Sequence, residues 1–202
     1  MTREQQRQLR NLKKELPHIV QAEIKQYKIN KRDFMIWRRR GDVFYDASVS
    51  VGQKDNKCYC SVRGMYKPLW LDDLFWDIMG MEENKKEPLS LRCIGAFTVY
   101  GNQFMEDRRE MKSWSVEEMS ICVREYISRF ALETEEDICS RFAEEIPGTP
   151  YHADLRQVLY LIYLEKYVDA GRRIAVMDQD LFVNKGIGFR AAAMEYCRQR
   201  MM

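Results

Sequence analysis

The sequence predicts an α+β protein: an antiparallel sheet of about four strands packed with helices, followed by a helical C-terminal half. Three observations predict it. Residues 33–66 contain short runs rich in β-formers, in which apolar and polar positions often alternate. Residues 67–80 carry apolar side chains at helical spacing. From residue 115 onwards helix-type patterns and helix caps dominate.

Four segments are predicted as strands. Asp33–Trp37 is apolar on both faces, and Val43–Val51 alternates between apolar and polar residues. Gly41 lies between these two segments and supplies the positive φ that a tight connection needs. Cys58–Tyr66 follows a polar turn, and Leu91–Tyr100 has the same strand character. We therefore expect a three-stranded meander, with a fourth strand added after a helical excursion.

The first half also contains two helix-type patterns. Residues 3–27 are predicted as helix with an interruption at Pro17, because a proline removes a helix hydrogen bond and clashes with the preceding turn. Lys67–Gly80 is predicted as a short helix, with proline near its start and glycine at its end. Its expected core residues are Leu71, Leu74, Phe75 and Ile78. Met81–Pro88 is expected to be a charged loop.

Gly101–Trp114 is polar, and we expect irregular structure and a boundary there. It would divide the chain into an α+β sheet domain, residues 1–112, and a helical region, residues 113–202, which either stands alone or shares one core with the first. Ser115 and Glu118 have the spacing of a capping box. The helix that they open has as its expected core Met119, Cys122, Val123, Tyr126, Ile127 and Phe130.

The remaining chain is also predicted as mainly helical. Thr134–Asp137 has the pattern of a second cap, and Pro147–Pro150 is a turn. Asp154–Asp169 is apolar on nearly every side and is predicted as the central helix of this half, stopped by Gly171. Phe189–Gln199 is predicted as the terminal helix.

The composition is that of an ordinary globular protein, with 46% hydrophobic and 32% charged residues. No run approaches the roughly 20 apolar residues of a membrane span, and no apolar signal region opens the chain. We therefore expect a cytoplasmic protein. Its six cysteines follow strand and helix patterns, and we expect them to be reduced and mostly buried.

Charge is unevenly distributed, although the net charge is only +2. Residues 1–40 hold twelve Lys or Arg and four acids, whereas residues 115–165 hold eleven acids and four Arg. The two net charges are +8 and −7. Such asymmetry indicates either a partner surface or two oppositely charged segments that meet in the fold.

One segment matches a nucleotide-binding pattern, G-x-G-x-x-A, from Gly186 to Ala191. That function needs a second strand with an acidic residue about 20 positions further on, and the sequence has too few residues left for it. We expect a bend followed by a helix start, with a weak anion site near Lys185 as the alternative.

Residues for other chemistry are few. The only histidines are His18 and His152, and neither has a neighbour that marks a catalytic unit. Cys58-x-Cys60 lacks the further ligands of a zinc site. The carboxylates of residues 72, 73 and 77 are predicted to lie at a helix start and on a solvated face, and Asp178-x-Asp180 is too short for a calcium loop. We expect no catalytic residue, no metal ligand and no cofactor.

Basic and aromatic residues interleave between residues 31 and 40, as a nucleic-acid surface would require. The stronger interpretation is structural, since the aromatic residues would alternate into the sheet core and the arginines would cluster at a hairpin. Nucleic-acid binding is therefore the third hypothesis.

The order of elements in the first half resembles bacterial domains of unknown function of the 4304 type. The resembling residues are Asp33–Trp37, Gly41–Ser50, Cys58–Pro68 and Leu69–Ile78. No activity is established for that family, so the resemblance implies no catalytic residues. Some similar small α+β domains look like immunity proteins against bacterial toxins, which implies a binding role. The resemblance does not extend beyond Ser115.

The leading hypothesis is a non-catalytic, immunity-like module that binds another protein. The alternative is a small-ligand-binding protein or an enzyme, with a cleft between sheet and helices near Arg63, Asp72 and Asp73. No membrane partner is expected. The residues expected on a partner- or ligand-binding surface are Arg38, Arg39, Arg40, Tyr59, Arg63, Tyr66, Trp70, Asp72 and Asp73.

Overall fold

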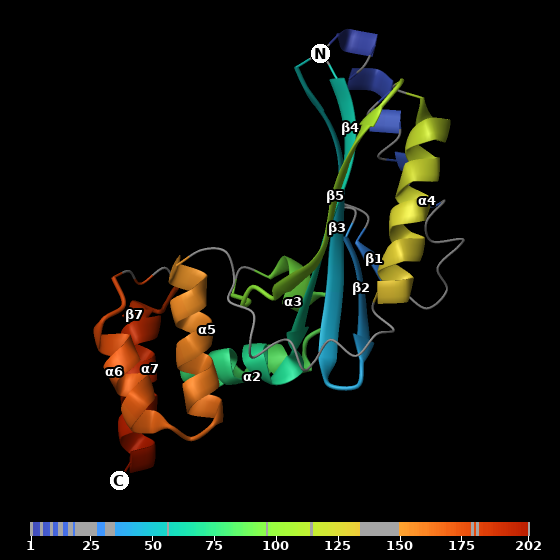
Figure 1. The fold of residues 1–202 in the computed structure, drawn as a ribbon. Coiled ribbons are helices and arrows are strands. Elements are labelled where there is room, and N and C mark those ends of the chain that lie inside the picture. The colour runs from blue at the N-terminus through green and yellow to red at the C-terminus, as the bar shows by residue number, and fades with distance from the viewer. Residues whose placement is uncertain are drawn as a thin grey trace. The chain divides into compact units, whose positions relative to one another are not determined.

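The antiparallel sheet that the sequence predicts is present and has five strands (Figure 1). In the computed structural model these are Lys28–Asn30 (β1), Met35–Arg40 (β2), Val43–Lys54 (β3), Lys57–Pro68 (β4) and Asn102–Met111 (β5). They lie in the spatial order β1-β2-β3-β4-β5, so each strand pairs with its sequence neighbour. The α+β fold class is thereby confirmed.

The structure describes residues 2–4, 6–8, 10–11, 14–15, 18, 28–30, 35–55, 57–95, 97–113, 115–133, 150–178, 180 and 182–201. The described residues between 3 and 18 are helical, as predicted. The expected break at Pro17, the strand start at Asp33, the cap at Thr134 and the turn from Pro147 lie outside this set. Within it, no helix is both long and apolar enough to cross a bilayer.

The chain forms two compact units. The sheet unit comprises Met1–Tyr66 and Gln103–Ser140, and the helical unit comprises Lys67–Asn102 and Arg141–Met202. This division differs from the expected boundary at residue 112, because the chain passes between the units three times.

The register of the β2–β3 hairpin agrees with the alternation pattern of β3. Ile36 pairs with Ala47, and Arg40 pairs with Val43 next to the turn. Gly41 has φ +54°, the left-handed conformation that the sequence predicted for this connection. The expected inward positions of β3 are buried from residue 43 to residue 49.

The predicted fourth strand is wrong in position. Leu91–Ile94 is a short helix (α3), and its turn is closed by the Gly95 N–H bonding to the Leu91 carbonyl at 2.8 Å. The strand is instead β5, in the segment expected to be irregular. β5 is rich in charges, and its ion pairs run across to β4: Lys57 to Glu110 at 2.9 Å and Arg63 to Glu106 at 3.2 Å. A single strand's pattern does not contain such cross-strand partners.

Helix α4 (Val116–Glu133) covers one face of the sheet (Figure 1). The Ser115 hydroxyl accepts the Glu118 N–H at 3.1 Å, which confirms half of the capping box. The other half is absent, because the Glu118 carboxylate instead accepts the N–H groups of Lys112 and Ser113. All six predicted core residues of this helix are buried.

The helical unit contains helices α2 (Leu69–Ile78), η1 (Glu82–Lys86) and α3, then α5 (Pro150–Tyr163), α6 (Tyr167–Ala175) and α7 (Phe189–Met201). Strands Val183–Asn184 (β6) and Ile187–Gly188 (β7) form a small hairpin before α7. The predicted helices at Lys67–Gly80 and Phe189–Gln199 are confirmed. α5, α6 and α7 lie side by side in Figure 1.

The predicted helix Asp154–Asp169 is wrong, because the chain breaks at residues 164–166. Glu165 adopts φ +59°, the Lys166 N–H bonds to the Leu161 carbonyl and the Glu165 N–H to the Ile162 carbonyl, both at 2.9 Å. This is a Schellman motif with glutamate in the place where glycine is usual. The expected stop, Gly171, lies inside α6 instead.

Candidate functional site

The outward face of α4 is the most distinctive exposed surface of the sheet unit. The inward face buries the predicted stripe, whereas Ile121 and Leu132 are 51% and 69% exposed. Eleven residues make about three helical turns, so these two side chains lie on one face, about 16 Å apart along the axis. Large apolar side chains therefore mark both ends of this face.

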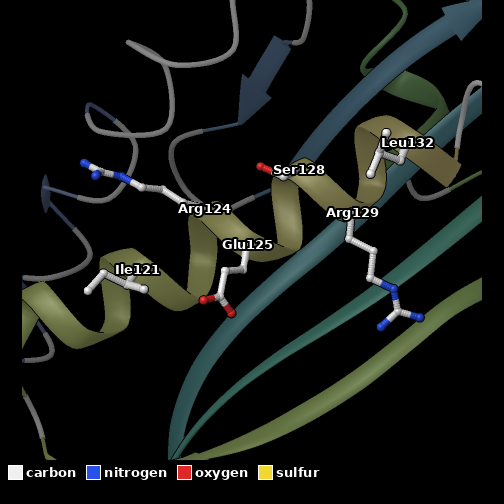
Figure 2. Close-up of a pocket in the computed structure, with 6 residues that line it drawn as sticks. All are labelled: Ile121, Arg124, Glu125, Ser128, Arg129 and Leu132. Atoms are coloured by element: carbon white, nitrogen blue, oxygen red, sulfur yellow. The ribbon is translucent and has the colours of Figure 1, made fainter.

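The side chains between them are polar and line a shallow hollow of about 480 Å³ (Figure 2). Its described lining residues are Ile121, Arg124, Glu125, Ser128, Arg129 and Leu132, all from α4; we call this set the α4 face. Small-molecule pockets usually surround their ligand with several elements. The described lining comes from one helix, a geometry better matched to a protein surface.

Two polar residues of the α4 face are held by β5. Figure 2 shows Glu125 and Arg129 reaching to the same side of the helix, while Arg124 points to the other. Glu125 forms an ion pair with Arg109, and Arg129 lies 4.0 Å from Asp107. These contacts fix two charged side chains of the α4 face against the sheet edge.

The helical unit has a second polar cluster, which is buried. Asp72 is fully buried between Lys67 and Arg92, at 2.9 Å and 3.3 Å. The Lys67 ammonium also donates to the carbonyls of Arg92 and Val99, at 2.8 Å and 2.7 Å. The Val99 N–H donates to the Asp72 carboxylate at 2.9 Å.

The expectation that Asp72 lies on a solvated face is therefore wrong. It stands one turn into α2, and its carboxylate fastens that helix to the end of β4, to α3 and to the 97–99 segment. Both carboxylate oxygens have partners, as buried charges require. Chemically this is a structural anchor, and its groups are enclosed rather than presented to a ligand.

The other expected site residues of the helical unit lie nearer the surface. Asp73 accepts a hydrogen bond from Arg92 at 2.6 Å and is partly exposed. Trp70 stacks on Tyr163 with ring centroids 4.0 Å apart. Both have partners within the unit.

The expected site residues of the sheet unit differ in how far their side chains are exposed. Arg39 and Arg40 are exposed at the end of β2, and Arg39 bonds to the Gly41 carbonyl at 2.6 Å. Arg38 is only partly exposed. Nucleic-acid binding by this arginine run stays a prediction.

On β4, Arg63 is exposed and paired to Glu106. Tyr59 stacks under the Arg108 guanidinium, 3.9 Å from its ring centroid. Tyr66 is buried, with its ring 6.4 Å from that of Tyr45, so it belongs to the core and not to a surface.

The alternative anion site before α7 is filled by the chain itself. The Asp180 carboxylate accepts the Arg190 N–H at 3.2 Å, and a Cβ on Gly188 would clash with that carboxylate. The glycine is there because it leaves room for the internal cap. Lys185 and Gly186 have φ values of +50° and +82° in the hairpin turn, so the bend expected from the glycines is present.

The histidines and acids gather into no reactive cluster among the described residues. His152 packs on Tyr100 with ring centroids 4.4 Å apart, and burial lowers its pKa. In the described part of the chain no three His, Cys, Asp or Glu side chains come together as a metal site requires. The described cysteines form no disulfide, and four of the five are buried, as expected.

The α4 face is not among the site residues predicted from the sequence, although the sequence contains a signal for it. Ile121 and Leu132 are apolar residues that fall outside the buried stripe of the same helix. Isolated exposed apolar residues are common on protein surfaces. Two on one face, with charged residues between them, form a pattern that an explicit helical projection would have found.

This chain matches no known protein-family profile, no curated protein and no solved structure.

Proposed function

We propose that the protein is a non-catalytic protein-binding module of the cytoplasm and that the α4 face is its docking surface. The observation that carries the proposal is the exposure of Ile121 and Leu132 at the two ends of one helical face. Protein interfaces combine apolar anchor side chains with polar neighbours, and the α4 face presents both. The role is of the same kind as that of an immunity protein, which acts by binding.

The charges of the α4 face define the partner. Glu125 is paired with Arg109 and Arg129 lies 4.0 Å from Asp107, so the α4 face together with its β5 contacts holds three arginines and two acids. A complementary surface would place an acidic side chain between two apolar ones. Such charge matching contributes mainly to specificity and to the rate of association.

A second copy of the chain is less suited to bind the α4 face than a different protein is. Aligning Ile121 of one copy with Leu132 of another, helices antiparallel, brings Arg124 opposite Arg129. Like charges placed across an interface oppose association. We therefore infer a different protein as the partner.

The length of the α4 face sets the expected affinity. Three helical turns supply less than the roughly 800 Å² per partner of a standard interface. Neighbouring residues would have to add area, and we expect a transient complex with a Kd on the order of micromolar.

The proposal can be tested by photocrosslinking. The full chain would carry benzoylphenylalanine in place of Ser128, at the centre of the α4 face, and be irradiated in native lysate at ordinary salt. The same amino acid at Arg172, exposed on α6 of the helical unit, is the control. We expect a distinct adduct from residue 128 alone, whose partner is then identified, purified and titrated.

The affinities of two double variants for the purified partner test the proposal. Ile121→Asp/Leu132→Asp should weaken binding at least tenfold, because buried apolar anchors dominate interface energies. Val168→Asp/Val176→Asp removes a matched pair of exposed apolar residues, 56% and 66% exposed, from the helical unit, and should leave binding unchanged. Equal affinities for both variants, or no adduct at all, would contradict the proposal.

A further inference from the structure

The exposed side of α4 has the residue spacing of a coiled-coil seam. One row along it consists of Ile121, Glu125, Ser128 and Leu132, at steps of four, three and four residues. The a and d positions of a heptad recur at these steps, so a second helix can follow this row over about three turns. All four side chains are exposed. The row therefore offers a partner helix a continuous line of contact.

The hollow on this row corresponds to two adjoining holes of the kind found in coiled coils. There, a knob side chain of one helix inserts into a hole formed by residues i, i+3, i+4 and i+7 of the other. Starting at Ile121, this rule gives residues 121, 124, 125 and 128, and starting at Glu125 it gives residues 125, 128, 129 and 132. Together these are the same six residues that line the hollow of about 480 Å³ (Figure 2).

The middle of the row is open because its two central side chains leave space there. Ser128, which belongs to both holes, is short. The Glu125 carboxylate is drawn aside by its ion pair with Arg109, and Figure 2 shows it on the same side of the helix as Arg129. Arg109 is itself held in place, with its guanidinium 5.7 Å from the centre of the buried Tyr126 ring. The holes therefore exist before a partner binds, which lowers the cost of ordering side chains on binding.

An arginine stands on each side of the row. Arg124 and Arg129 occupy the positions that flank a heptad seam, and in Figure 2 they point to opposite sides of α4. Residues at these flanking positions select the partner of a coiled coil by its charge. A guanidinium carries five N–H donors, so an arginine that already lies near one carboxylate, as Arg129 does near Asp107, can bind another. Both flanks therefore favour carboxylates on the incoming helix.

We propose that the partner segment bound by the α4 face is an amphipathic helix with acidic flanks. Two of its apolar side chains, four residues apart, enter the two holes, because the holes are offset by four positions along α4, or about 6 Å. Further apolar residues of the same row contact Ile121 and Leu132 at the two ends. Asp or Glu residues on both sides of the row face Arg124 and Arg129. The inference rests on the proposed function and adds the shape and chemistry of the partner.

Other kinds of partner segment fit the α4 face less well. A partner strand binds mainly by adding to the exposed edge of a sheet, whereas the described lining of this hollow belongs to a helix. A basic helix would place like charges across both flanks, which opposes association. Shape and charge therefore favour the same occupant, an acidic helix.

The test uses the full chain and a labelled synthetic helix of about three heptads, followed by fluorescence anisotropy. This acidic probe has Ile and Leu on its seam, Ala at its outward positions to favour helix, and Glu at its flanking positions, whose mutual repulsion opposes self-association. One control probe has Lys in place of every Glu. The other has the composition of the acidic probe, with its apolar residues spread around the helix. We expect a Kd of roughly 100 μM for the acidic probe and at least tenfold weaker binding of both controls.

Variants of the chain test the holes and the flanks separately. Ser128→Gln puts a longer neutral side chain at the position shared by both holes and should weaken binding of the acidic probe at least fivefold. Arg124→Glu/Arg129→Glu reverses both flanks and should invert the preference, so that the lysine probe binds at least tenfold more tightly than the acidic one. Arg172→Glu/Arg198→Glu makes the same change of charge at exposed positions of the helical unit and should bind as the wild type does. Circular dichroism confirms folding, and Arg124→Glu alone replaces the double variant if that variant is unfolded.

The inference is overturned if the acidic probe does not bind, if it binds no better than the lysine probe, or if Ser128→Gln leaves its affinity unchanged. The photocrosslinking experiment separates this failure from a failure of the proposed function. An adduct from residue 128 that maps to an acidic amphipathic helix of the partner supports the inference. An adduct that maps to a strand or to a basic segment overturns it and leaves the proposed function standing, whereas the absence of any adduct contradicts the proposed function itself.

Discussion

The two units use charged residues in opposite ways. Across β4 and β5 of the sheet unit, Arg63–Glu106 and Lys57–Glu110 are ion pairs between exposed side chains. In the helical unit, Asp72 is fully buried between two cations. Water screens the exposed pairs, so each contributes little to stability. A buried charge is tolerated only when its counter-charges and hydrogen-bond partners are present.

The comparison shows that ion pairs at similar distances have different roles. The exposed pairs set the cross-strand partners of an edge strand and keep that edge charged, which discourages pairing with another chain. The buried cluster fixes where α2 lies against α3 and the 97–99 segment. Four substitutions, in order of decreasing effect on stability, test the charge and packing arrangements of the two units.

The largest effect should come from Asp72→Asn. It keeps the shape of the side chain but leaves the buried Lys67 without its counter-charge and Arg92 with Asp73 alone, and we expect a loss of about 3–5 kcal/mol in the free energy of unfolding. Urea unfolding followed by tryptophan fluorescence measures it, because Trp70 and Trp76 both lie in α2. Asp73→Asn is the matched control and should lose far less. Similar losses for the two variants would remove the distinction between buried and exposed charge.

The sheet unit should be more sensitive to packing than to charge, and Gly64→Ala tests this. A Cβ there would lie 2.9 Å from the Phe104 ring and 3.1 Å from the Met105 Cβ. We expect a destabilisation of roughly 1–3 kcal/mol, measured by urea unfolding. Gly52→Ala, with no atom within 4 Å of the added Cβ, is the control. An equally small effect at both positions would show that the Phe104 ring moves aside freely.

Backbone strain at Glu165 in the helical unit predicts that a substitution there can raise the stability of the protein. Glu165 holds a left-handed conformation that glycine adopts without steric cost, so Glu165→Gly should stabilise the protein by up to about 1 kcal/mol. The midpoint of thermal unfolding measures this. A loss of stability would mean that the glutamate side chain contributes more than the strain that it causes.

The smallest effect should follow Glu106→Gln. Hydrogen bonds from Gln103 and Arg63 lower the pKa of Glu106, so its contribution to stability is present above the unfolded-state pKa and disappears as pH falls through the folded-state value. Because the side chain is exposed, the urea midpoints of variant and wild type should nearly coincide at pH 7 and coincide at pH 3. A clear difference at high salt would contradict the screening argument.

Much of the fold could be predicted because its signals are local. The Val43–Val51 alternation, the turn at Gly41 and the Ser115 cap each depend on residues a few positions apart, and each is present. The same holds for the buried stripe of α4. Side-chain period and backbone conformation are properties of short segments.

Two of the incorrect predictions have the same cause, partners that are remote in sequence, and a third has a different cause. β5 was missed because its charges are matched by residues of β4 that are 43 and 53 positions away. Asp72 lies in the first turn of α2, as predicted, but its burial was missed because its partners Arg92 and Val99 are remote in sequence. The break at Glu165 was missed because no glycine marks it.

Local sequence patterns were enough to predict the α+β class, the central strands and the principal helices. Only the folded chain shows which charges are buried, which strand occupies the sheet edge and which residues of β4 pair with those of β5. The physical reason is that burial and pairing depend on partners brought together by folding, whereas periodicity and capping are written within one turn or one strand.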